Sequence, residues 1–104
     1  MAKSIIKSGA CNFTTTVTAT ASDGQIVSIQ IDTSCPNVAK AASQLKEVDA
    51  YAELFSKLHE TEVYKTLSES IPHPTCPVFS GVLKTVEVAA GLALPKDVSI
   101  TIEK

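Results

Sequence analysis

Hydrophobic and polar residues alternate at both ends of the chain, which is the pattern of β-strands with one buried face. Residues 12–21 are rich in β-branched residues, and Ser22-Asp23-Gly24 is a typical turn sequence. We therefore predict a hairpin whose second strand is residues 25–33. Residues 3–7 indicate a short edge strand, and residues 97–103 indicate a final strand.

The hydrophobic pattern also predicts how the two hairpin strands pair. If Ala21 lies opposite Gln25, most apolar side chains gather on one face of the hairpin. That face is predicted to carry Phe13, Thr15, Val17, Ala19, Val27, Ile29 and Ile31. The same pairing places Cys11 opposite Cys35 at the open end of the hairpin, on its core-facing side.

The middle of the chain has apolar residues at helical spacing. Thr33 or Ser34 suits a helix cap and Pro36 a first helical turn, and Thr75 and Pro77 repeat this arrangement. Four helical stretches are predicted, through Val38, Ala41, Ala42 and Leu45, through Ala50, Leu54 and Leu58, through Val63, Tyr64, Leu67 and Ile71, and through Val78, Val82, Val86, Ala89, Ala90 and Ala93. The last is expected to end near Gly91 or before Pro95.

Together these elements predict one α+β domain over residues 1–104. A small, largely antiparallel sheet, made of the N-terminal hairpin and the C-terminal strand, is expected to carry helices packed on one face. A length of 104 residues is typical of a single domain.

Composition and charge narrow the functional classes. The formal net charge is −2, and all nine basic residues are lysine, so the chain lacks the arginine that commonly reads phosphate and guanine. We therefore predict no nucleic-acid partner. No apolar run is long enough for a signal peptide or a membrane helix, which predicts a cytoplasmic protein without a membrane partner. Helix faces rich in Val and Ala would permit a homo-oligomer.

Three cysteines are the main candidate for chemistry. In the reducing cytoplasm they are expected to be thiols, and an odd number does not suit a pure disulfide framework. Cys35 and Cys76 each precede a predicted helix, whose free N–H groups favour a thiolate. If Cys11 joins them, three thiolates could hold an iron–sulfur cluster or a zinc ion, with the fourth position open to a small ligand.

Other interpretations of these residues stay open. A metal-free thiol enzyme would use Cys76 or Cys35 as its nucleophile. A small interaction module would simply bury the cysteines in its core. His73 could complete the site, although a loop histidine is the plainer interpretation. Lys84 and Glu87 are spaced to form an exposed ion pair, and would otherwise face the site as accessory residues. The sequence does not decide whether the protein is an enzyme, and it identifies no catalytic residue.

Several motifs resemble a family of short, uncharacterised prokaryotic proteins, and the resemblance spans nearly the whole chain. The motifs are Gly9-Ala10-Cys11-Asn12-Phe13, Ser34-Cys35-Pro36-Asn37-Val38, His73-Pro74-Thr75-Cys76-Pro77-Val78, Gly81-Val82-Leu83-Lys84 and Glu87-Val88-Ala89-Ala90-Gly91-Leu92-Ala93-Leu94-Pro95. The resemblance implies that all three cysteines belong to the family pattern, but it implies no activity. Asn12 stands where glycine is usual, and Phe79 where a second proline is usual. Thr33-Ser34-Cys35-Pro36 alone also resembles a motif of small domains associated with ribonucleotide reductases.

Overall fold

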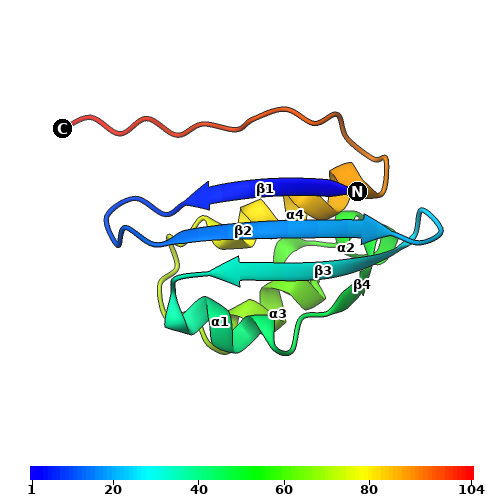
Figure 1. Ribbon diagram of the computed structural model, residues 1–104, viewed down its shortest axis with the longest axis horizontal. Helices are drawn as coiled ribbons and strands as arrows, with labels where there is room; N and C mark the ends of the chain where they lie inside the picture. The colour runs from blue at the N-terminus through cyan, green and yellow to red at the C-terminus, as the bar shows by residue number, and fades with distance from the viewer.

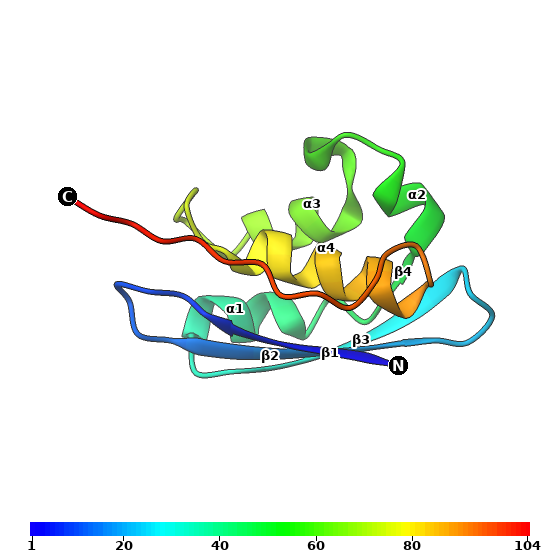
Figure 2. The same cartoon turned by 90° about the horizontal axis from the view of Figure 1, so that it is seen from above.

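The computed structural model describes residues 1–104 and consists of one four-stranded antiparallel sheet with helices on one face (Figures 1 and 2). The strands lie in chain order across the sheet, so each pairs with its neighbour in sequence. The elements are β1 (Ala2–Lys7), β2 (Thr14–Ala21), β3 (Ile26–Thr33), α1 (Pro36–Ala42), β4 (Glu47–Asp49), α2 (Ala50–Leu54), the 3₁₀ helix η1 (Leu58–Glu60), α3 (Glu62–Ser68) and α4 (Val78–Ala89). The predicted α+β class, with helices on one face of a small antiparallel sheet, is confirmed.

The pairing of β2 with β3 differs from the prediction by two residues. Ala21 lies opposite Val27 rather than Gln25, because the connection between the paired residues is two residues longer than predicted. Asp23 stabilises this longer turn, since its carboxylate accepts hydrogen bonds from the backbone N–H groups of Gln25 and Ile26, at 2.9 and 2.8 Å. A shift of two residues keeps every side chain on its predicted face. The predicted faces are therefore right, while the predicted pairing of Cys11 with Cys35 is wrong.

The core lies between the sheet and the helices. Fifteen buried hydrophobic residues form it, and they come from β2, β3, β4 and from all four α-helices or the loops beside them. They are Val17, Ala19, Val27, Ile29, Val38, Ala41, Leu45, Val48, Ala50, Val63, Leu67, Ile71, Val78, Val82 and Val86. Aliphatic residues thus supply the whole core, as the low aromatic content requires.

Helix α4 crosses the sheet and packs closely on β1. Gly81 faces Ile6, and a Cβ atom at this glycine would overlap the Ile6 side chain. One turn further on, the hydroxyl groups of Ser4 and Thr85 are hydrogen-bonded at 2.6 Å. The absence of a side chain at Gly81 therefore allows the helix to approach the edge of the sheet.

Two strand predictions need correction. The sheet contains β4, a three-residue strand that the sequence pattern did not indicate. Residues 97–103 form no strand and leave the body as an extended segment, although the sequence alternates there. No helix is long and apolar enough to span a membrane.

Candidate functional site

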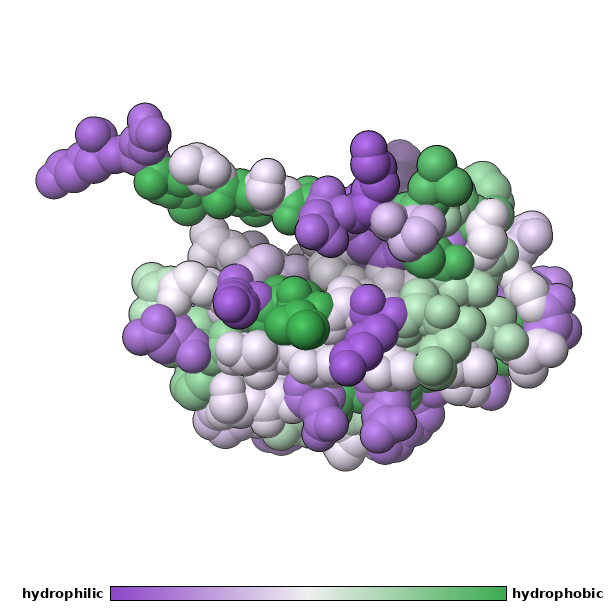
Figure 3. Space-filling model, turned by 45° about the horizontal axis from the view of Figure 1, so that its top comes forward, coloured by the Kyte–Doolittle hydropathy of each residue, from purple (hydrophilic) through white to green (hydrophobic).

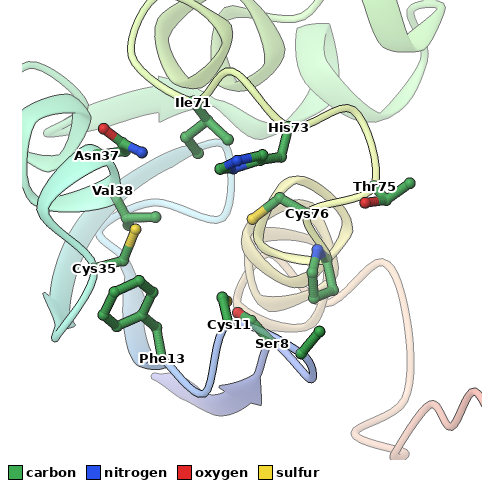
Figure 4. A pocket seen from close by; sticks show the side chains of 12 residues that line it. Ser8, Cys11, Phe13, Cys35, Asn37, Val38, Ile71, His73, Thr75 and Cys76 are labelled. Carbon is green, nitrogen blue, oxygen red and sulfur yellow. The ribbon is translucent and has the colours of Figure 1, made fainter.

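A pocket of about 220 Å³ opens at one end of the sheet, where three segments meet. The loop between β1 and β2, the start of α1 and the loop between α3 and α4 each contribute one cysteine. Figure 4 shows the sulfur atoms of Cys35 and Cys76 and the ring of His73 pointing into the space between these segments. The lining residues are Ser8, Ala10, Cys11, Phe13, Cys35, Asn37, Val38, Ile71, His73, Thr75, Cys76 and Pro77. We call this site the thiol pocket.

The end of the hairpin holds Cys35 in place. The Thr33 hydroxyl accepts a hydrogen bond from the Cys35 N–H at 3.1 Å, and Ser34 exchanges backbone and side-chain hydrogen bonds with Thr14 on the neighbouring strand. Pro36 then begins α1 directly, so Cys35 itself is the residue that caps the helix. Its thiol is half-buried and free. The predicted helix start is confirmed, but neither Thr33 nor Ser34 caps it.

Cys76 lies just before α4, with its thiol partly buried against the core. Its backbone N–H donates to the carbonyl of His73 at 3.3 Å, which closes the turn before the helix. Burial raises the pKa of the Cys76 thiol above its ordinary value, and the neighbouring Cys35 and Cys11 raise it further, while a hydrogen bond from the Val78 N–H lowers it. The thiol is therefore protonated at neutral pH. The start of α4 therefore does not lower the pKa of this thiol below its ordinary value, because the effect of burial outweighs that of the single N–H group.

Cys11 lies in the loop between β1 and β2 and is exposed. A tight turn forms this loop: the Asn12 N–H donates to the Gly9 carbonyl at 2.8 Å, and the Ser8 N–H donates to the Phe13 carbonyl at 3.1 Å. Asn12 has a φ of 60°, in the left-handed region that glycine adopts freely and asparagine tolerates. The turn therefore carries Cys11 away from the hairpin ladder in which it was predicted to face Cys35.

The predicted three-thiolate metal site is wrong. No three His, Cys, Asp or Glu side chains lie close enough together to hold a metal ion. Cys11 lies on an exposed turn, whereas Cys35 and Cys76 are partly buried in the wall of the pocket.

The accessory residues divide between two places. His73 lines the thiol pocket, as one interpretation of the sequence required. Lys84 and Glu87 do not line it; Lys84 Nζ and Glu87 Oε1 are 3.6 Å apart and form the ion pair that their spacing indicated, with Lys84 exposed and Glu87 partly buried. Lys84 instead borders a second groove beside β1.

Sequence reasoning missed the apolar wall of the pocket and one polar residue within it. Phe13, Val38 and Ile71 were recognised only as core-facing positions, and Asn37 was not singled out at all. The sequence signal that could have found these residues is that each lies within a few positions of Cys11, Cys35 or His73. None of the twelve lining residues is Asp, Glu, Lys or Arg, so the pocket offers no fixed charge to a ligand.

Residues 2–102 match the model of a family of unknown function, DUF6951. The chain belongs to this family. The match covers all elements of the fold and all three segments of the thiol pocket. No curated protein and no solved structure matched the chain in the corresponding comparisons. Membership of DUF6951 therefore does not indicate an activity, and the pocket is the feature from which a function can be inferred.

Proposed function

We propose that the thiol pocket binds a small uncharged organic molecule, and that the thiols of Cys35 and Cys76 contact it. The observation that carries this proposal is the convergence of three free thiols, from three separate segments, on a pocket whose lining has no acidic or basic residue other than His73. Ligand sites are typically concave, largely apolar and provided with a few polar groups that orient the ligand. The thiol pocket has each of these properties.

The size of the pocket restricts the ligand. Its volume of about 220 Å³ is below the roughly 300–1,000 Å³ of pockets that take drug-sized molecules. A molecule with a single ring or a short aliphatic chain suits this space. Phe13, Val38 and Ile71 offer apolar contacts to the body of such a molecule.

The polar groups of the lining favour a ligand with one hydrogen-bonding end. Ser8, Asn37 and Thr75 provide hydroxyl and amide groups, which both donate and accept hydrogen bonds. The protonated thiol of Cys76 adds a weak donor, since its raised pKa keeps the proton on sulfur at neutral pH. A carboxylate or phosphate would enter this pocket without a lysine or arginine to balance its charge, which is costly. An alcohol, amide or ketone would not incur that cost.

The test uses a matched set of one-ring probes and backbone amide NMR. Cyclohexanone, benzyl alcohol and benzamide represent the expected class, and cyclohexanecarboxylate and benzoate are charged analogues of similar size. We expect at least one uncharged probe at millimolar concentration to shift the amides of Asn37, Thr75 and Cys76, while the charged analogues leave them unchanged. If no uncharged probe shifts these amides, or if the carboxylates shift them equally, the proposal is wrong.

Two variants of Cys35 show whether the shifts arise within the pocket. Cys35→Phe places a large ring where the thiol points into the pocket, and Cys35→Ser keeps its size. Binding should be lost in the first variant and retained within about threefold in the second. The amide spectrum of each variant reports its folding directly, so a loss of binding in a well-folded Cys35→Phe protein is informative.

A further inference from the structure

The C-terminal residues 97–103 leave the body of the protein with their apolar side chains uncovered. Val98, Ile100 and Ile102 are 64, 78 and 88% exposed, and they alternate with polar residues along the chain. Alternation of this kind is typical of a strand with one buried face. Figure 3 shows this segment standing clear of the body along its outer part. We call residues 97–103 the C-terminal arm.

The edge of the sheet beside the arm is also unpaired. Strand β1 pairs with β2 on one side only, so its other side presents a row of free backbone N–H and C=O groups. Ile5 on this strand is 63% exposed. A groove of about 850 Å³ separates the edge from the start of the arm, and it is bordered by β1, by Lys84, Thr85 and Val88 of α4 and by residues 95–98.

We propose that a second copy of this chain fills this groove, with its C-terminal arm adding to β1 as a fifth strand while its own β1 receives the first arm. The arm and the edge belong to the same chain, so a single two-fold axis places the arm of each copy against the β1 edge of the other. The occupant is therefore a copy of the protein, and the product is a dimer with exchanged arms.

The direction of the arm favours exchange over pairing with its own β1. Figure 1 shows the arm running alongside β1 in the same direction, so self-pairing would be parallel in a sheet that is otherwise antiparallel. A two-fold axis perpendicular to β1 reverses the arm of the second copy, which then runs antiparallel to the edge. Antiparallel pairing is somewhat more stable for each residue.

The side chains of the arm and the edge are complementary in this arrangement. Lys3, Ile5 and Lys7 lie on the outer face of β1, whereas Ser4 and Ile6 face α4. If the apolar face of the incoming arm also turns toward α4, its acidic residues Asp97 and Glu103 lie on the outer face. In the antiparallel register that places Glu103 opposite Lys3, Asp97 lies diagonally beside Lys7.

The first measurement is the mass of the full-length protein in solution by sedimentation equilibrium. We expect twice the 11.0 kDa of the chain. Two variants add the same charge on opposite faces of the arm: Ile100→Asp should give a monomer, and Thr101→Asp should remain a dimer. A monomeric wild-type protein, or a dimer that survives Ile100→Asp, would overturn the proposal.

Hydrogen exchange of the arm amides provides a second measurement that needs no variant. Exchange of arms predicts that protection of residues 98–102 rises with protein concentration, because the added strand exists only in the dimer. Protection that is already present in the monomer would show that the arm pairs with its own β1, and the proposal would be wrong. Amides that stay unprotected at every concentration would also refute it.

Discussion

The buried carboxylate of Glu53 is predicted to contribute strongly to stability through the start of α3. Glu53 lies in α2, is only 5% exposed and accepts hydrogen bonds from the backbone N–H groups of Glu62 and Val63, both at 2.8 Å. These are among the first N–H groups of α3, which have no partner within the helix. Thr61 satisfies a third, that of Tyr64, at 3.1 Å.

The cost of losing the carboxylate follows from these two bonds. A hydrogen bond to a charged group contributes about 1.5–3 kcal/mol, so Glu53→Ala should lower the free energy of unfolding by about 3–6 kcal/mol. Glu53→Gln keeps one acceptor but turns an amide group toward the other N–H, and should lower it by about half as much. Because small domains have only about 5–15 kcal/mol in total, either loss is easily measured by urea unfolding followed by circular dichroism.

A matched variant separates this capping role from a simple change in net charge. Glu69→Gln removes the same charge at the exposed end of α3, where no hydrogen bond to the side chain is formed, and should change stability by less than about 0.5 kcal/mol. A loss below about 1 kcal/mol in Glu53→Ala would refute the reasoning, since it would mean that water replaces the carboxylate without cost.

Three further predictions concern Cys76, Gly81 and the ion pair on α4. Burial raises the pKa of the Cys76 thiol in the folded protein, so this thiol ionises at lower pH in the unfolded chain. The free energy of unfolding should therefore fall as the pH rises above about 8.5. Urea unfolding between pH 7 and 10 should show this fall, and the fall should be weaker in Cys76→Ser. Gly81→Ala should destabilise the protein by about 1–3 kcal/mol, although alanine has the better helix propensity, because the added methyl group overlaps the Ile6 side chain. Thermal unfolding should show that part of this lost stability returns when Ile6→Ala is combined with Gly81→Ala. Replacement of Lys84 by Met should change stability by less than about 1 kcal/mol, since the Lys84 side chain in its pair with Glu87 is about half exposed to water; a larger loss in urea unfolding would contradict this.

The fold class could be predicted from local patterns because each element has its own periodicity. Strands β2 and β3 were visible as alternation, and α4 as a helical row of valines that ends before Gly91. Strand β4 was not visible, since three residues are too few to show a period. The C-terminal arm was predicted as a strand because its apolar and polar residues alternate. In the structure, however, no strand of the chain pairs with it.

The candidate site was predictable in its residues but not in its geometry. Cys35 and Cys76 each precede a proline at the start of a helix, and this shared pattern predicted that they belong to one site. Both line the thiol pocket. The mutual placement of the thiols depended on turns, whose conformation a pattern of apolar residues does not specify. The longer turn at Asp23 shifts the hairpin pairing by two residues, and the turn at Asn12 places Cys11 in a loop outside the strand ladder.

The sequence by itself determined which faces of the strands and helices are buried, because apolar periodicity acts residue by residue and survives a shift of two in register. It also determined that the cysteines gather at one end of the fold, since they stand beside the element ends that meet there. Only the tertiary structure decided whether the thiols point at one another, how far Cys76 is withdrawn from water and that the C-terminal arm has no partner in its own sheet. These properties depend on ångström-scale contacts between segments far apart in the chain, and no local pattern encodes such distances.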